Sequence, residues 1–255
     1  MLSIEFRKLK STGFLPSIVI GGILAALIPI LNTAARPDTF TSQTGPVLSI
    51  LLDANAQMIL LLHLILVICG ACTMFHTEYA GRALNHMLAL PLRPEGLYLK
   101  KAVILILCFL LLLTLEAAGL SFCASRWFGL SEDFFPELIR YLGSIALLSL
   151  PTILFMLLIA LLNENMWVSL GIGITFLSMA TVLTDGPFAL KLVPFLTPFA
   201  GLEETCTVLA AGDTFSGDLK NLLLCAVAET IILIIAARSE ERRVGKECRS
   251  RWSPY

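Results

Sequence analysis

Three ionisable side chains lie within otherwise apolar stretches of the sequence, and they are the first candidates for chemistry. Glu116 and Glu229 each lie among hydrophobic residues, and His63 lies in a third apolar stretch, where it could be the partner of either acid. An ionisable group inside a bilayer costs about 3 kcal/mol on insertion scales, so it usually faces a bundle interior or a wet cavity. These residues therefore indicate either a substrate pathway or interhelical hydrogen bonds, worth about 0.6 kcal/mol each, that fix the helix packing.

The other motifs that could do chemistry are absent or incomplete. The sequence contains no phosphate-binding loop of the form G-x-x-x-x-G-K-[ST], no H-E-x-x-H and no G-x-S-x-G. Its three histidines are scattered, and its seven cysteines are an odd number that predicts no disulfide framework. Only Cys123 and Cys206 fall in predicted outer loops, where they could pair in an oxidising compartment. We expect no catalytic residue, metal site or cofactor in this chain.

The composition indicates which elements must hold these residues. The chain has 255 residues, of which 57% are hydrophobic and 15% are charged, and its mean hydropathy is +0.85. A soluble domain carries about a quarter charged residues. This composition excludes a secreted disulfide scaffold, a disordered chain and a nucleic-acid-binding domain with a broad basic face. It predicts a multi-pass membrane protein.

The apolar residues are grouped into segments close to bilayer thickness, for which a spanning helix needs about 20 residues. We predict an all-α membrane protein with six transmembrane helices, over residues 14–31, 57–75, 102–122, 141–162, 166–183 and 222–237. The last span is the shortest. Strands of a β-barrel would alternate apolar and polar residues, whereas Leu105–Leu115 is apolar on every face except at Thr114.

Basic residues predict the orientation of these helices. With both termini in the cytoplasm, the inner segments 1–13 and 77–101 hold seven Lys or Arg residues, whereas the outer segments 32–56, 123–140 and 185–221 hold five over about twice the length. The apolar and basic residues among the first 13 positions predict an amphipathic helix that lies in the membrane interface, with its basic side chains toward anionic lipid. Its candidate residues are Phe6, Arg7, Lys8, Leu9 and Lys10. The alternative is a frayed terminus with stop-transfer charges.

The amino-acid composition changes after residue 238. Residues 1–238 are predicted to form a single transmembrane domain. Residues 239–255 change abruptly to a charged sequence that resembles a translated adaptor tail. The alternative interpretation of this tail is a basic segment that binds anionic lipid.

The inner loop between the second and third spans is the most informative segment. Arg82–Leu90 can form about two helical turns with Leu84 and Leu88 on one face, and Pro91 ends that helix. Pro94 then suits the first turn of the next helix. A short surface helix flanked by charge suits docking onto another protein. The alternative is a membrane-surface connector that has no partner.

This loop resembles the first cytoplasmic loop of ABC-2 type exporter permeases. The resemblance rests on Glu78-Tyr79, on Leu88-Ala-Leu-Pro91-Leu-Arg93 and on Lys100-Lys101. In that family the loop often contains F-x-x-E-x-x-x-G-T, a leucine-rich turn and P-x-x-R. Here Gly81 is followed by Arg82 in place of Thr. The start of the chain, Glu5-Phe6-x-Lys8-Leu9-Lys10, is similar to the bacitracin-resistance and lantibiotic-immunity branch of the family.

The resemblance implies a bacterial plasma-membrane permease subunit that exports a hydrophobic or amphipathic substrate, with antimicrobial peptides as the favoured class. It implies a second permease chain, identical or related, and a cytoplasmic ATPase that binds ATP and Mg²⁺, so this chain would not itself be an enzyme. It also implies a short re-entrant segment at Phe188–Gly212, which would be shielded from water. The residues that it places in the ATPase-coupling loop are Glu78, Gly81, Arg82, Leu84, Leu88, Pro91 and Arg93.

Two other functions remain open at this point. An ion- or proton-coupled secondary transporter would use Glu116 or Glu229 as its relay and would need no ATPase. An intramembrane enzyme would have only His63, Glu116 and Glu229 available. In the exporter, these same three residues are candidates for the substrate cavity or pathway. The sequence leaves the substrate and the choice between homodimer and heterodimer undecided.

Overall fold

The computed structural model describes residues 13–80, 97–184, 186–212 and 216–251, which form helices joined by short connections. No strand occurs in these ranges, so the all-helical fold class is confirmed for the described part of the chain. The long helices are α2 (Phe14–Ala35), α4 (Val47–Ala80), α6 (Leu97–Cys123), α7 (Phe134–Leu162) and α11 (Gly217–Arg251). The shorter ones are α3 (Pro37–Thr41), the π-helical turn η1 (Ala124–Phe128), α8 (Met166–Val182), α9 (Phe188–Lys191) and α10 (Thr197–Ala211).

Five of the described helices are long and apolar enough to cross a bilayer: α2, α4, α6 together with η1, α7, and α11 as far as Glu240. Helix α8 has 17 residues and is a shorter apolar helix. Helix α11 continues without interruption from Arg238 to Arg251, so the backbone shows no boundary at residue 239.

Several helices are longer than the spans predicted from hydropathy. Helix α4 begins at Val47, ten residues before the predicted span, and the buried residues Leu48, Leu51, Leu52 and Ala56 lie on one face of that extension. Polar Asp53 and Asn55 lower the hydropathy of the same turns. A hydropathy window detects the average over all faces, whereas a helix is stabilised by burial of one face against its neighbours.

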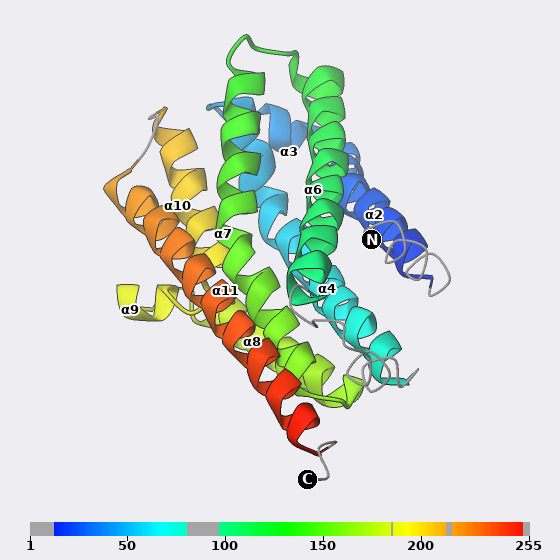
Figure 1. The fold of residues 1–255 in the computed structure, drawn as a ribbon. Helices are drawn as coiled ribbons and strands as arrows, with labels where there is room; N and C mark the ends of the chain where they lie inside the picture. Colours follow the sequence, from blue (N-terminus) through cyan, green and yellow to red (C-terminus); the bar gives the residue numbers. More distant parts are fainter. Residues whose placement is uncertain (1–12, 81–96, 185, 213–215, 252–255) are drawn as a thin grey trace.

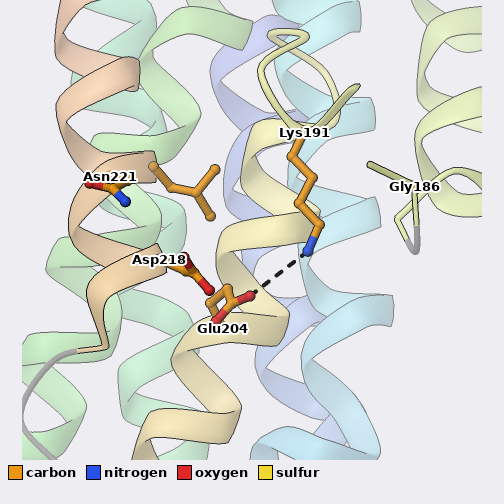
Figure 2. A pocket seen from close by; sticks show the side chains of 6 residues that line it. Gly186, Lys191, Glu204, Asp218 and Asn221 are labelled. Atoms are coloured by element: carbon orange, nitrogen blue, oxygen red, sulfur yellow. Dashed lines mark ion pairs between the residues drawn. The ribbon is translucent and has the colours of Figure 1, made fainter. Parts of the chain in front are cut away.

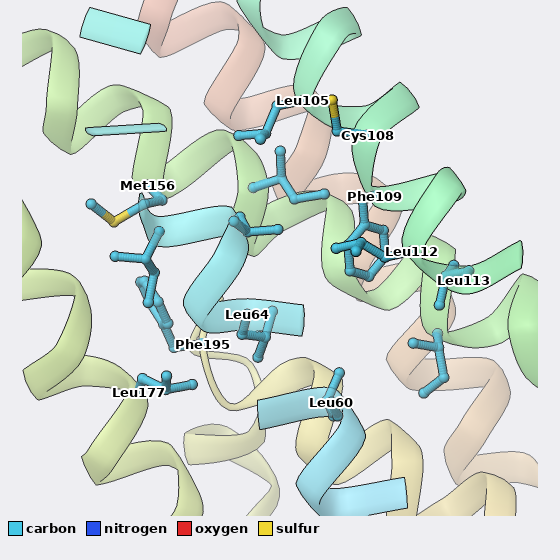
Figure 3. Packing of buried hydrophobic residues seen from close by; sticks show 14 of the residues in the cluster. Leu60, Leu64, Leu105, Cys108, Phe109, Leu112, Leu113, Met156, Leu177 and Phe195 are labelled. Carbon is cyan, nitrogen blue, oxygen red and sulfur yellow. The ribbon is translucent and has the colours of Figure 1, made fainter. Parts of the chain in front are cut away.

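Helix α4 lies at the centre of the bundle (Figure 1). It contacts α2, α6, α7, α8 and α10, while α2 also packs along α6, and α11 packs along α7. Leu60 and Leu64 of α4 belong to the same main apolar core as Leu105 and Phe109 of α6 (Figure 3). A second, smaller apolar cluster joins α7, α10 and α11.

Small residues permit the closest helix contacts. A Cβ atom on Gly119 of α6 would lie 2.6 Å from the backbone oxygen of Ala26 on α2, so these two helix backbones are nearly in contact. Gly21, Gly22 and Gly173 lie against side chains of neighbouring helices in the same way. Gly171 does not, because a Cβ atom there would meet nothing within 4 Å of the described residues.

The segment before α11 folds back into the bundle. Phe195 is fully buried; its ring stacks on Phe176 of α8 at 5.6 Å and meets the edge of Phe155 of α7 at 6.1 Å. Thr152 of α7 donates a hydrogen bond to the carbonyl of Pro194. Residues 195–202 are all buried, but Leu190, Glu203 and residues 210–212 are exposed, so the predicted shielding holds for only part of Phe188–Gly212.

The connections define two ends of the bundle. The α2–α4 and α6–α7 connections, the second of which contains Gly129, lie at the upper end in Figure 1, which we call the Gly129 end. The α7–α8 connection at Asn163 and the last described residues of α4 lie at the opposite end, the Asn163 end. Helix α11 runs from the Gly129 end toward the Asn163 end.

Candidate functional site

Most residues of the predicted docking loop lie outside the described part of the chain. They are Gly81, Arg82, Leu84, Leu88, Pro91 and Arg93. The predicted interfacial residues Phe6, Arg7, Lys8, Leu9 and Lys10 also lie outside it. The structure does describe Glu78 and the two helices, α4 and α6, that lead into and out of the loop. We call the end of α4 and the start of α6, with Glu78, Tyr79, Tyr98 and Lys101, the loop base.

A buried ion pair joins the two helices at the loop base. Lys101 Nζ lies 3.4 Å from Glu78 Oε1 and donates a hydrogen bond of 2.7 Å to the carbonyl of Met74. It also lies 5.2 Å from the centre of the Phe75 ring, a cation–π contact. Both charged residues are only 2% exposed. A charge so fully removed from water persists only where a partner compensates it, so this pair holds the end of α4 against the start of α6.

Two tyrosines join the same loop base to α7. Tyr79, next to Glu78, donates its hydroxyl hydrogen bond to the carbonyl of Leu161. Tyr98, in the first turn of α6, donates to the carbonyl of Leu154 at 2.7 Å. Leu161 lies in the last turn of α7, where carbonyls have no partner within the helix, so Tyr79 satisfies an otherwise open acceptor. Residues on both sides of the loop are thereby fixed to a third helix.

Sequence reasoning gave these anchoring residues no role. Tyr79 and Lys101 were part of the motif that carried the resemblance, and Tyr98 was not singled out. Opposite charges at the facing ends of two consecutive helices were the available signal for the Glu78–Lys101 pair. No comparable signal exists for the tyrosines, because their acceptors are backbone carbonyls far away along the chain.

A second polar cluster lies in the middle of the bundle. Glu116 of α6 accepts a hydrogen bond of 2.9 Å from the hydroxyl of Tyr141 on α7, and its other oxygen lies 3.7 Å from Nδ1 of His63 on α4. The ring of His63 also meets the edge of Phe109, with 6.0 Å between ring centres. Each of the three polar residues is at most 1% exposed. The cluster thus connects three helices around one carboxyl group.

The structure separates the two intramembrane acids. His63 lies beside Glu116, whereas Glu229 lies on α11, where it is half-buried and makes no ion pair or hydrogen bond with His63, Glu116 or Tyr141. A buried oxygen of Glu229 has no hydrogen-bond partner in the described part of the chain. His63 and Glu116 can therefore act together, and Glu229 is a separate site.

A pocket of about 350 Å³ lies where α9, α10 and α11 approach one another (Figure 2). Lys191 and Glu204 form an ion pair of 3.8 Å across it, and Asp218 and Asn221 of α11 lie on the other side. Gly186 and Leu222 complete the lining. The sequence did not single out these residues. Their mixture of one cation, two carboxylates and an amide suits a polar ligand rather than an apolar chain.

The cysteines form no disulfide among the described residues. Cys123 is buried at the end of α6 and Cys206 lies on α10, and both are free thiols, so the pairing left open by the sequence is not observed. No three His, Cys, Asp or Glu side chains within the described ranges come close enough to hold a metal ion.

Comparison with known proteins gives one match. Residues 1–180 match the model of a family described as ABC-2 family transporter protein. This match covers the helices from α2 to most of α8, and with them both the loop base and the His63–Glu116–Tyr141 cluster. No curated protein and no solved structure matches the chain.

Proposed function

The chain belongs to the ABC-2 transporter family, and on this premise we propose that it exports a hydrophobic or amphipathic substrate, with antimicrobial peptides as the favoured class. Membership makes it a permease subunit of an ABC transporter and a multi-pass plasma membrane protein. The proposal adds the direction of transport, the cargo and the partner chains. The peptide cargo is supported by the amino-terminal motif around Phe6 and Lys8.

The observation that carries the proposal is the geometry of the loop base. The loop over residues 81–96 begins and ends at residues that are fixed to one another and to α7: Glu78, Tyr79, Tyr98 and Lys101. A force applied to the loop would therefore move α4, α6 and α7 together instead of bending the loop alone. This arrangement suits a loop that receives the nucleotide-driven movement of an ATPase.

In the proposed arrangement, the Asn163 end faces the cytoplasm. Both termini are then cytoplasmic, α8 acts as the fifth of six spans, and the segment from α9 to α10 re-enters from the outside. The density of basic residues in the loops supports this orientation. The ATPase would dock at the loop over residues 81–96, and the amino-terminal segment would lie in the inner membrane interface.

The proposed mechanism is alternating exposure of a cavity between two permease chains. The second chain is identical to this one or related to it, and each chain receives one ATPase subunit that binds ATP and Mg²⁺. Closure of the ATPase pair would push the coupling loops, and the anchored helices would turn the cavity from one side of the membrane to the other. This chain would contribute no catalytic residue.

The alternative is a secondary transporter driven by ions or protons through Glu116 or Glu229. The buried pair of His63 and Glu116 could bind a proton, which suits the alternative. A secondary transporter, however, needs no ATPase and therefore no docking loop that is anchored at both ends. The two functions differ in their energy source. ATP-dependent movement of cargo supports the exporter, and movement driven by a pH gradient without ATP supports the alternative.

The test uses the full chain, co-expressed with its proposed ATPase partner and reconstituted in lipid vesicles. We expect ATP-dependent movement of a fluorescently labelled cationic antimicrobial peptide, and none with an ATPase that lacks its phosphate-binding lysine. The variant Tyr98→Phe should leave ATP hydrolysis in place and reduce peptide movement several-fold, because it removes one of the two tyrosine hydrogen bonds that fix the loop base to α7. Thr175→Ala is the matched control, since within the described part of the chain that exposed hydroxyl donates to a carbonyl of its own helix.

Two results would contradict the proposal. Peptide movement that persists without ATP would remove the ATPase from the mechanism. Equal transport by Tyr98→Phe and Thr175→Ala would show that the loop base does not transmit movement.

A further inference from the structure

His63 is a fully buried side chain with unsatisfied polar atoms. Neither ring nitrogen has a hydrogen-bond partner in the described part of the chain, although Glu116 Oε2 lies 3.7 Å from Nδ1. Buried polar groups nearly always have a hydrogen-bond partner, so a fully buried imidazole whose ring nitrogens have none requires a physical explanation. An N–H···O hydrogen bond measures about 2.7–3.2 Å, so a movement of about 0.5–1 Å between α4 and α6 would complete one.

The charge of the pair depends on one proton. When a carboxylate and a neutral imidazole together bind one proton, the total charge of the pair is zero. The proton then lies either on Glu116, as a carboxylic acid beside imidazole, or on His63, as a carboxylate beside imidazolium. Without that proton the pair carries one negative charge, and Tyr141 compensates it with a single hydrogen bond. An uncompensated charge away from water is costly, so the neutral state is the stable one in the closed bundle.

The enclosure of the cluster limits what can bind there. His63, Glu116 and Tyr141 are each at most 1% exposed. Leu60 and Leu64, which lie close to His63 along α4, and Phe109 and Leu112, which precede Glu116 on α6, belong to the apolar core (Figure 3), and the ring of Phe109 contacts His63. A peptide or a hydrated cation could enter only if the helices separated. A proton adds almost no volume.

Other titratable groups lie on helices that pack around this cluster. Tyr141 is electrostatically coupled to Cys206 of α10, and Cys206 is coupled to the exposed carboxylates of Asp53 and Glu203. Helix α2, which also packs against α6, has no titratable side chain among residues 14–35. Glu229 of α11 forms no bond with the cluster.

We propose that His63, Glu116 and Tyr141 form a binding site for one exchangeable proton between α4, α6 and α7. As α4 and α6 approach, the O–H bond at Glu116 Oε2 breaks and an N–H bond forms at His63 Nδ1. Tyr141 keeps its hydrogen bond to Oε1 throughout. Loss of the proton to the exterior leaves the carboxylate charge and favours separation of the helices. The site stands whatever the cargo of the exporter.

Infrared spectroscopy of the full chain in lipid vesicles tests the site over a range of pH. We expect the wild type to show the C=O stretching band of a protonated carboxylic acid that titrates with pH. The band should be absent in Glu116→Gln and retained in Glu229→Gln, the matched control. In His63→Phe the midpoint of its titration should shift by about one pH unit or more, because the partner that shares the proton is gone.

Equal spectra for the wild type and Glu116→Gln at every pH would overturn the proposal. So would a titration unchanged in His63→Phe, since a merely structural carboxyl group would not respond to the imidazole. Tyr141→Phe removes one hydroxyl and preserves the ring, so it is the second test variant if the Glu116→Gln protein does not insert into the membrane. There the band should move in frequency, and an unmoved band would contradict the assigned contact.

Discussion

Lys101 and Glu78 form a buried ion pair, 3.4 Å from Nζ to Oε1, between two helices whose connection is 16 residues long and lies outside the described ranges. The pair joins the first turns of α6 to the last turns of α4, and Phe75 covers the ammonium group. The residues before and after the loop are thus held in register by a contact from which water is excluded.

Replacing Lys101 by Met should destabilise the protein strongly. The substitution leaves Glu78 buried beside an apolar side chain, and removal of one partner of a buried ion pair costs about 3–5 kcal/mol. The double variant Lys101→Met/Glu78→Gln should recover part of the loss, because no buried charge remains. Unfolding of the three proteins in mixed micelles measures the difference. A double variant no more stable than Lys101→Met would show that the ion pair is not the reason for the loss.

The variants Leu84→Asp and Leu88→Asp should weaken co-purification with the partner ATPase at least several-fold. Both leucines lie on the predicted apolar face of the docking helix, and a carboxylate placed in an apolar contact is left without a partner. Leu130→Asp is the control, since Leu130 is 52% exposed in the connection at the Gly129 end. Equal recovery of the ATPase with all three variants would rule out docking at this loop.

Replacing Gly119 by Ala should cost about 1–3 kcal/mol of stability, the range for overpacking a close contact. The added methyl group would lie 2.6 Å from the backbone oxygen of Ala26, so α2 and α6 would have to separate. Gly143→Ala is the matched control on α7, where a Cβ atom meets nothing within 4 Å of the described residues. That change should be neutral or stabilise by up to about 1 kcal/mol. Unfolding of both variants under the same conditions tests the contrast.

Cysteines introduced at the two ends of the bundle should report the orientation. Ser131→Cys, at the exposed Gly129 end, should react with a membrane-impermeant maleimide in intact cells, and Glu164→Cys, at the Asn163 end, only after permeabilisation. The native Cys206 should contribute little background. Burial, aided by the nearby carboxylates of Asp53 and Glu203, raises the pKa of its thiol to about 12, so almost no reactive thiolate is present at neutral pH. The reverse labelling pattern would invert the proposed topology.

Much of the architecture could be predicted because hydropathy is a sum over neighbouring residues. Each of the five long apolar helices contains a span predicted from the sequence, α8 covers the predicted span 166–183 except for its last residue, and all described elements are helical. The helix limits were less accurate. Helix α4 starts at Val47 rather than near residue 57 because its amphipathic first turns are stabilised by contact with neighbouring helices, which an average over a window does not detect.

The sequence by itself determined that this chain is a helical membrane protein and that His63, Glu116 and Glu229 are exceptional residues in apolar surroundings. These properties depend on residue type and local spacing. Only the tertiary structure decided that His63 meets Glu116 and not Glu229, that Tyr141 donates to the same carboxyl group, and that Tyr79 and Tyr98 fix the loop base to α7. The rotation and depth of each helix are set by packing at sites such as Gly119 and Ala26, between residues far apart along the chain. Periodicity within one helix carries no information about which residue of another helix it will face.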